Sequence, residues 1–193
     1  MTRQEAQQKL KSIFGFDDFF YNQWITIERL FKGERVLLIE KTGFGKSLCY
    51  QFPAIQFGGT TIVFSPLIAL MRDQVNKLKS IGIKAESINS NQTIDENNKI
   101  IDEAKNNRIK LLYIAPERME NVEWLQSARE MQISMVVVDE AHCISVWGHD
   151  FRPAFRRIVN LVNLLPKRFP VLATTATATK RVEEDIKKQI GGD

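Results

Sequence analysis

The sequence predicts an α/β domain with a mostly parallel central sheet and helices on both faces. Short apolar runs alternate along the chain with segments whose apolar residues recur at helical spacing, and this alternation is typical of such a sheet. The runs are rich in Val, Ile and Leu without regular polar alternation, as expected when helices cover both faces of each strand.

Five apolar runs are predicted to be buried strands, namely Val36–Ile39, Thr61–Ser65, Lys110–Ala115, Met135–Asp139 and Val171–Thr175. Helical spacing of apolar residues follows the second run over Leu67–Leu78 and returns near the end of the chain over Val182–Ile190. A polar stretch between the second and third runs is predicted to hold a helix over Asp95–Lys105, flanked by loops. The Gly191-Gly192 pair is predicted to end the last helix at a domain edge.

The composition indicates one folded domain over residues 1–193. Hydrophobic residues make up 44% of the chain, which is enough to bury a core, and the net charge of +4 is compatible with a polyanionic partner without establishing one. Cys49 and Cys143 are the two cysteines, without metal-ligand spacing around them, so we expect a reducing cytoplasmic setting. The polar N-terminus lacks a signal-peptide core, and no apolar run reaches membrane-spanning length, so no membrane partner is expected.

A glycine-rich segment directly after the first predicted strand has the features of a phosphate loop. Gly43 and Gly45 let backbone N–H groups converge on phosphate oxygens at a helix N-terminus, Lys46 can reach terminal phosphates, and Ser47 can offer its hydroxyl to Mg²⁺. The full pattern G-x-x-x-x-G-K-[ST] fails at its first position, which is Glu40. A plain strand-to-helix turn is therefore the alternative.

An acidic pair ends the fourth predicted strand. Asp139 can bind Mg²⁺ at the strand end, and Glu140 can position or activate an attacking water. The alternative is a solvated acidic turn that caps the next helix. The combination of a phosphate loop and an acidic pair on separate strands of one sheet favours nucleotide binding over that alternative. His142, considered alone, is more typical of a structural hydrogen-bonding residue.

An aromatic loop, which we define as residues 143–153, follows the acidic pair at once. It holds Trp147, Phe151 and Arg152 beside the expected catalytic carboxylates. Aromatic residues in a loop can anchor a fold, and they can also stack with single-stranded bases. The chemistry of the residues does not decide between these two roles.

Taken in order, these segments resemble the first RecA-like domain of RecQ-family DNA helicases, in helicase superfamily 2. The similarity covers about residues 14–190, nearly the whole chain. It rests on Gly43–Gln51 as motif I, Ser65–Gln74 as motif Ia, Tyr113–Arg118, Asp139–His142 as motif II, the aromatic loop, and Thr175–Thr177 as motif III. The aromatic loop directly after Asp-Glu-Ala-His is highly specific to this family.

The resemblance implies a RecA-like P-loop domain and a role for each matching residue. It implies that Lys46, Asp139, Glu140 and His142 take part in ATP hydrolysis, with Ser47 and Asp139 as Mg²⁺ ligands. Expected ATP contacts are Phe16, Gln23, Thr42, Gly43, Phe44, Gly45, Lys46 and Ser47. Expected DNA-binding or coupling residues are Ser65, Arg72, Arg118, Trp147, Phe151, Arg152, Thr175 and Thr177, with Thr175 and Thr177 acting through Asp139 and His142.

Some positions depart from the family pattern. Phe20 replaces an arginine between Phe16 and Gln23, so adenine contacts are expected to be weaker or limited to stacking, and Val146 replaces a glutamine of the aromatic loop. Glu40 and Lys41 replace a neutral pair. We expect the Glu40 carboxylate to point away from the phosphates, toward Lys41 or another cation.

The resemblance further implies ATP-driven 3′ to 5′ translocation on single-stranded DNA and duplex unwinding, with branched DNA as a further partner. We expect these 193 residues to be the first of two RecA-like domains in a longer protein, and to be weakly active alone because the arginine finger of superfamily 2 lies in the second domain. The alternatives are an ATP-gated nucleic-acid binding module, a duplex translocase that never separates strands, a degenerate interaction scaffold and an RNA helicase.

Overall fold

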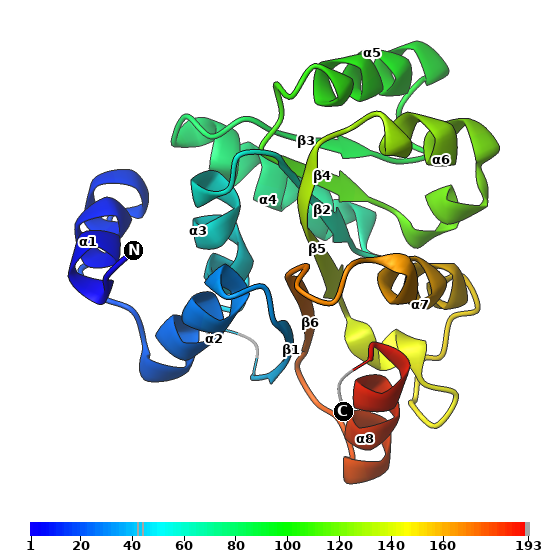
Figure 1. Cartoon of the computed structure of the whole chain (residues 1–193). Helices are drawn as coiled ribbons and strands as arrows, with labels where there is room; N and C mark the ends of the chain where they lie inside the picture. Colours follow the sequence, from blue (N-terminus) through cyan, green and yellow to red (C-terminus); the bar gives the residue numbers. More distant parts are fainter. Residues whose placement is uncertain (42, 44, 192–193) are drawn as a thin grey trace.

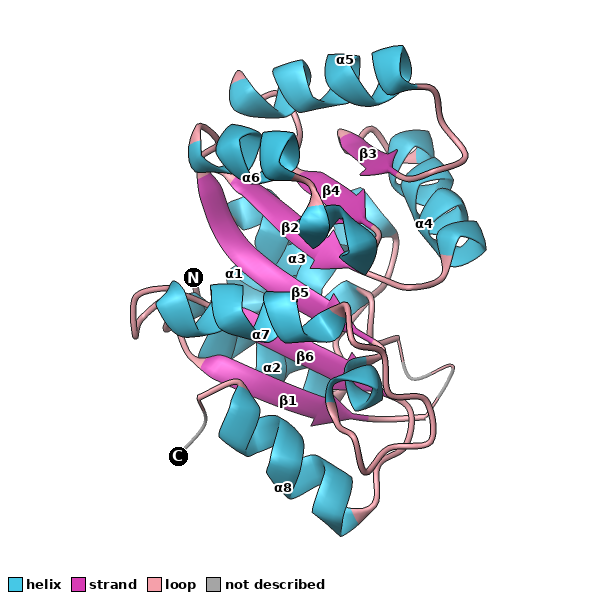
Figure 2. Ribbon diagram, turned by 90° about the vertical axis from the view of Figure 1, so that its right-hand side faces the viewer, coloured by secondary structure: helices cyan, strands magenta, loops and turns pink. Residues whose placement is uncertain are grey.

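A parallel sheet forms the centre of the computed structural model, which describes residues 1–41, 43 and 45–191. In the described residues the sheet has six strands in the order β1-β6-β5-β2-β4-β3, and every neighbouring pair is parallel. The strands are β1 (Arg35–Ile39), β2 (Thr60–Phe64), β3 (Ala85–Ile88), β4 (Leu111–Ile114), β5 (Ile133–Asp139) and β6 (Val171–Thr175). Their arrows all point the same way in Figure 2.

Helices connect the strands and cover both faces of the sheet (Figure 1). The α-helices are α1 (Arg3–Lys9), α2 (Tyr21–Phe31), α3 (Leu48–Gln56), α4 (Ile68–Ser80), α5 (Ile94–Lys105), α6 (Val122–Arg129), α7 (Phe155–Leu164) and α8 (Lys180–Gln189). A π-helical turn, η1 (Leu10–Phe14), extends α1, and 3₁₀ turns form η2 (Pro116–Glu120) and η3 (Ala141–Ile144).

Alternate residues of each central strand enter two separate cores. In β5, Val136 and Val138 pack with α7 and α8, whereas Met135 and Val137 pack with α3 and α4. Because both faces are covered by helices, every second position that would meet water in a one-sided sheet must be apolar here as well. This arrangement explains the continuous apolar runs in the sequence and confirms the predicted α/β class.

A third core joins the N-terminal helices to the helix after β1. Leu10, Phe19, Trp24 and Phe52 are buried together, and the Phe19 ring meets the Phe52 ring edge to face at a centroid distance of 5.1 Å. This packing sets the N-terminal segment against α3, and so places residues 16–23 beside the loop that follows β1.

The predicted strands and helices are confirmed with small differences at their ends, and one strand was missed. β3 is a short edge strand that pairs only with β4 among the described strands, and its Ala85-Glu86-Ser87-Ile88 sequence alternates apolar and polar residues weakly. Its ladder to β4, not its own composition, makes this segment extended. A strand of four residues is too short to show a clear period in its sequence.

A buried polar network crosses the core between α3, α4 and β4. The Tyr50 and Tyr113 hydroxyls are hydrogen-bonded at 3.0 Å, and Gln51 Nε2 donates to Tyr113 Oη at 3.2 Å and to Gln74 Oε1 at 2.8 Å. Burial raises the pKa of Tyr113 to about 12 and holds the pKa of Tyr50 well above its usual range, so both hydroxyls stay protonated. The network ties the helix behind the glycine-rich loop to the helix that follows β2.

Replacing Tyr113 with Phe is expected to lower the free energy of unfolding by about 1–2 kcal/mol, because it leaves the buried Tyr50 hydroxyl and one amide hydrogen of Gln51 without a partner. Urea denaturation measures the loss. Tyr21→Phe is the matched control, since the Tyr21 side chain is 71% exposed and should be neutral. Equal stabilities for Tyr113→Phe and the parent chain would contradict this account of the network.

Candidate nucleotide-binding site

Three neighbouring strands deliver the predicted site segments to one edge of the sheet. The glycine-rich loop follows β1, the acidic pair ends β5, and Thr175 ends β6, which lies between β1 and β5. The carboxyl ends of parallel strands lie at one edge, where ligands bind in open α/β sheets. The pairing register sets Ile39 opposite Thr175 and Asp139 opposite Thr174, so the three segments start at the same level.

The loop after β1 has the backbone shape of a phosphate cradle. Gly43 and Gly45 have φ values of +92° and +85°, in the left-handed region that favours glycine. A Cβ at Gly43 would meet nothing within 4 Å, whereas one at Gly45 would lie 2.6 Å from Gln23 Nε2. Lys46 Nζ donates to the Glu40 carbonyl at 2.7 Å, so the ammonium stays on the inner side of the loop, and Ser47 precedes the first turn of α3. The predicted contacts Thr42 and Phe44 lie outside the described residues.

Gln23 joins the N-terminal segment to this loop. Its side chain is 4% exposed, Oε1 accepts from the Phe20 N–H at 2.8 Å, and Nε2 donates to the Gly45 carbonyl at 3.2 Å. Phe16 and Phe20 are more than half exposed and line a cavity of about 600 Å³ together with Gly43, Gly45 and Ser47. The cavity has aromatic surface suited to a flat base and opens onto the phosphate cradle.

The Glu40 carboxylate faces α2. Its Oε1 accepts a hydrogen bond from the Asn22 side-chain amide at 2.9 Å. The expected cationic partner was wrong, because within the described residues Glu40 takes part in no ion pair and a neutral amide satisfies it. The Glu40 carbonyl accepts the hydrogen bond from Lys46, while the Glu40 side chain points to the neighbouring helix α2. A side chain is therefore tolerated at this position, and glycine is not required.

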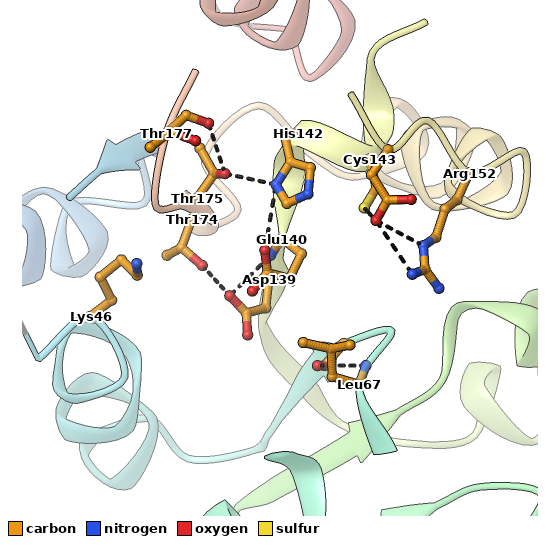
Figure 3. A network of polar contacts seen from close by, with 12 residues as sticks. Lys46, Leu67, Asp139, Glu140, His142, Cys143, Arg152, Thr174, Thr175 and Thr177 are labelled. Atoms are coloured by element: carbon orange, nitrogen blue, oxygen red, sulfur yellow. Dashed lines mark hydrogen bonds and ion pairs between the residues drawn. The ribbon is translucent and has the colours of Figure 1, made fainter. Parts of the chain in front are cut away.

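Asp139 is oriented by two hydrogen bonds to one oxygen. Its Oδ1 accepts from Thr174 Oγ1 at 2.8 Å and from the Glu140 N–H at 3.0 Å, and no described protein group donates to Oδ2. A carboxylate held at a strand end with one oxygen free of hydrogen bonds from the described residues fits Mg²⁺, which prefers few protein oxygens and retains water. Figure 3 shows Lys46 and Asp139 on the same side of the sheet edge.

Glu140 occupies a strained position with a perturbed acidity. Its φ of +56° places a non-glycine residue in the left-handed region, at a cost of roughly 1 kcal/mol. Burial raises the pKa of the Glu140 carboxyl, the neighbouring Asp139 charge raises it further, and the Lys46 ammonium opposes both effects. A carboxyl with a raised pKa beside a second carboxylate and opposite an ammonium is typical of a functional site.

His142 links the acidic pair to the end of β6. Its Nδ1 lies 2.9 Å from Thr175 Oγ1 and 3.4 Å from Glu140 Oε2, and Thr175 Oγ1 donates to the Thr177 carbonyl at 3.3 Å. Because the Thr175 hydroxyl donates to Thr177, we infer that His142 Nδ1 carries the imidazole proton and donates it to Thr175, along the contact drawn in Figure 3. Burial lowers the pKa of His142. The His149 ring, stacked on it with a centroid distance of 4.7 Å, lowers this pKa further, so the neutral imidazole is favoured.

Thr174 was missed by the sequence analysis. Thr175 makes the expected link to His142, but the link to Asp139 comes from Thr174, one residue earlier. The Thr-Thr pair at the end of β6 was visible in the sequence. Only the register between β5 and β6 decides which hydroxyl reaches which partner.

The aromatic loop is anchored to α8. Ser145 Oγ donates to Asp185 at 2.6 Å, and the Arg181 guanidinium lies 3.3 Å from the centroid of the Trp147 ring. Trp147 is still 55% exposed. Neither Arg181 nor Asp185 was singled out in the sequence, because both lie on a charged helix where such residues are usually solvated. The loop is therefore anchored to the fold while the Trp147 ring stays exposed, and its stacking on bases stays a prediction.

The remaining residues predicted to contact DNA follow β2, β4 and η3. Ser65 is buried, and its hydroxyl accepts from the Leu67 N–H at 3.4 Å, which stabilises the turn into α4. Arg72 is exposed on α4 and Arg118 is half-buried in η2. Arg152 pairs with Asp150 at 3.3 Å, and Phe151 lies under the Arg156 guanidinium at 5.5 Å. Their contacts with DNA stay predictions.

Comparison with known families shows which family has this arrangement of loop, acidic pair and threonines. The model of the DEAD/DEAH box helicase family matches residues 21–186. The chain belongs to this family. It is 44% identical over 186 residues to the ATP-dependent DNA helicase RecQ of Bacillus subtilis, covering 96% of this chain and 32% of that protein. Identity to the RecQ helicase of Haemophilus influenzae is 40% over 185 residues, covering 96% and 30%. The resemblance to the first RecA-like domain of RecQ helicases is confirmed.

Solved structures confirm the fold of this helicase domain. The helicase MrfA bound to DNA superposes with a TM-score of 0.76 at 20% identity, covering 98% of this chain and 28% of that one. Mycobacterium smegmatis Lhr, bound to single-stranded DNA and AMP-PNP, gives a TM-score of 0.71 at 19% identity, covering 96% and 25%. The chain spans about a third of the length of the curated relatives it matches. In the part of the chain that is described, no helix has the length and apolarity to cross a membrane.

Glu140→Gln is expected to raise the melting temperature at neutral pH. The pKa of Glu140 is raised in the folded chain, so this group contributes stability below its unfolded pKa, and the contribution is lost as pH rises through the folded pKa. Removing the charge at neutral pH therefore relieves burial and repulsion from Asp139. Thermal unfolding from pH 4 to 8 measures the effect, which should shrink toward pH 4. An increase of equal size at all pH values would show that ionisation of Glu140 is not its cause.

Proposed function

We propose that this helicase domain binds Mg·ATP between the loop after β1 and the acidic pair, and serves as the first of two RecA-like domains of a DNA helicase. In that protein ATP hydrolysis drives 3′ to 5′ translocation on single-stranded DNA and separates duplex or branched DNA. The names of the RecQ relatives, ATP-dependent DNA helicases, support the substrate. A cytoplasmic setting fits the two cysteines, which are both free thiols.

One observation carries the proposal. Lys46 from the loop after β1 faces the same space as Asp139, the last residue of β5, and Glu140, which follows it, and the Lys46 charge lowers the pKa of Glu140. A triphosphate between them would have an ammonium on one side and a cation-binding carboxylate on the other. Phosphoryl transfer is catalysed mainly by such positioning and charge stabilisation.

Each residue has a defined part in this reaction. The Lys46 ammonium exchanges the Glu40 carbonyl for phosphate oxygens, and the loop N–H groups at Gly43 and Gly45 orient them. Ser47 and Asp139 would hold Mg²⁺, which when bound neutralises charge on the β- and γ-phosphates. The Glu140 carboxylate orients the attacking water and accepts its proton, for which a raised pKa is favourable. The base rests in the cavity beside Phe16 and Gln23.

Coupling to DNA would pass along two hydrogen-bonded paths. His142 connects Glu140 to Thr175 and Thr177, and so to the turn after β6. The buried network of Tyr50, Gln51, Gln74 and Tyr113 connects α3 to α4, whose first residues follow Ser65. Ser65, Arg72 and Arg118 would contact backbone phosphates, which fix register without sequence preference. Trp147, Phe151 and Arg152 would sense the bases.

A second RecA-like domain would supply the arginine that neutralises charge on the transferring phosphate, as the arginine finger does in superfamily 2, and so would be required for full activity. The chain by itself should therefore bind ATP and hydrolyse it slowly. A duplex translocase that consumes ATP without separating strands is the competing function. The longer protein assayed on a tailed duplex distinguishes them, since ATP consumption without strand release favours the translocase.

Lys46→Ala is expected to lower the affinity of the chain for Mg·ATP by roughly tenfold or more, through loss of at least about 1.4 kcal/mol of charge-assisted hydrogen bonding. Fluorescence of a labelled ATP analogue measures binding. Glu40→Ala is the control and should leave the affinity unchanged, because the Glu40 side chain faces Asn22. A large gain in affinity for Glu40→Ala would place that carboxylate against the nucleotide.

Trp147→Ala is expected to weaken binding of single-stranded DNA by roughly 5- to 150-fold, the effect of about 1–3 kcal/mol of stacking on one base. Anisotropy of a labelled oligonucleotide at fixed salt measures the affinity. Leu164→Ala, at a side chain that is 84% exposed on α7, is the control. Unchanged affinity for Trp147→Ala would assign the ring to the fold alone, through its contact with Arg181.

A further inference from the structure

A histidine, a cysteine and an aspartate meet where the aromatic loop folds back on η3. The Arg152 N–H donates to the Cys143 carbonyl at 3.0 Å and closes the loop, which brings Asp150 over the Cys143 thiol. The Cys143 Sγ and Asp150 Oδ2 atoms are 3.8 Å apart. One ligand atom from each of His142, Cys143 and Asp150 lies within 4.8 Å of the other two, the one such three-residue group in the described part of the chain.

The orientation of His142 leaves one ring nitrogen available to a cation. Its Nδ1 proton is donated to Thr175 Oγ1, so Nε2 carries the lone pair. Figure 3 shows this second nitrogen on the side of the ring that faces Cys143. Metal-binding histidines usually donate the other ring N–H to an oxygen in this way, which fixes both tautomer and ring orientation.

The spacing and the ligand types suit zinc. Zn–S and Zn–O bonds of about 2.3 Å and 2.0–2.2 Å at a tetrahedral angle separate the two ligand atoms by roughly 3.6 Å, close to the 3.8 Å between Sγ and Oδ2. The Arg152 guanidinium bonds Asp150 Oδ2 at 3.3 Å and holds the carboxylate in place. The Asp150 side chain is 46% exposed, which leaves a path from solvent to the otherwise buried group.

We propose that His142 Nε2, Cys143 Sγ and Asp150 Oδ form a binding site for a thiophilic divalent cation, Zn²⁺ above all, with water as the fourth ligand. A nitrogen, sulfur and oxygen set selects zinc over Mg²⁺, which prefers oxygen alone. Binding replaces the thiol proton of Cys143 with the cation, and the proton leaves to solvent. The cation would tie the histidine behind the acidic pair directly to the aromatic loop. The site is independent of ATP hydrolysis, so its test does not depend on the proposed function.

Titration of the 193-residue chain with Co²⁺, in excess Mg²⁺ and without nucleotide, tests the site. The expected result is a near-ultraviolet thiolate-to-cobalt band that saturates at one cation per chain and disappears on addition of Zn²⁺. Mg²⁺ fills the Asp139 carboxylate, and any Co²⁺ bound there has no sulfur ligand and gives no such band. Cys143→Ser should abolish the band. Cys49→Ser, at the other buried thiol, should retain it.

Asp150→Asn provides a second variant that keeps the thiol, and it is expected to weaken Co²⁺ binding by about tenfold or more while the band remains. Circular dichroism establishes that each variant is folded. Absence of a thiolate band in the parent chain, or its persistence in Cys143→Ser, overturns the proposal and leaves the contact between Cys143 and Asp150 as a loop closure only. Equal Co²⁺ affinities for Asp150→Asn and the parent chain would remove the carboxylate from the site.

Discussion

The pairing of β6 between β1 and β5 is the constraint on which the rest of the site depends. Its register sets Asp139 opposite Thr174 and Ile39 opposite Thr175, and the Glu40 N–H continues the ladder to the Thr175 carbonyl. A shift of one residue would turn each side chain to the opposite face of the sheet. The Thr174 hydroxyl would then lose Asp139, and Thr175 would lose His142. The apolar cores on both faces make such a shift costly, so packing far from the site holds its polar atoms in place.

Polar groups of the candidate nucleotide-binding site are hydrogen-bonded to one another within the chain. Lys46 is bonded to the Glu40 carbonyl and Gln23 to the Gly45 carbonyl, so a nucleotide has to replace existing hydrogen bonds. The need to break these hydrogen bonds reduces the net affinity for nucleotide. While they are formed, they keep the loop compact and the Lys46 ammonium paired. Glu140, in contrast, destabilises the fold. Its positive φ strains the backbone, and its raised pKa shows that the ionised carboxylate is disfavoured in the folded chain. This loss of stability falls at the residue for which we propose a catalytic role.

The aromatic loop is the meeting point of several interactions. Ser145 and Trp147 attach it to α8, Arg152 closes it on Cys143, and His142 at its start reaches the end of β6. The Trp147 backbone is therefore joined to Glu140 by a short series of contacts through Ser145 and His142. The proposed cation site lies on that same path, so a bound Zn²⁺ would stiffen the connection between the aromatic loop and the acidic pair.

The sequence by itself determined the α/β class, the strand segments and the family, because continuous apolar runs and closely spaced motifs are local features. It also indicated the phosphate loop and the acidic pair, whose geometry follows from their positions at strand ends. The edge strand β3 was not visible, because its extended form depends on pairing with β4. Tertiary structure alone decided which threonine holds Asp139, that Asn22 satisfies Glu40, and that Arg181 stacks on Trp147. Each of these contacts joins residues distant in sequence, and sheet register or helix packing, not composition, sets the distance between them.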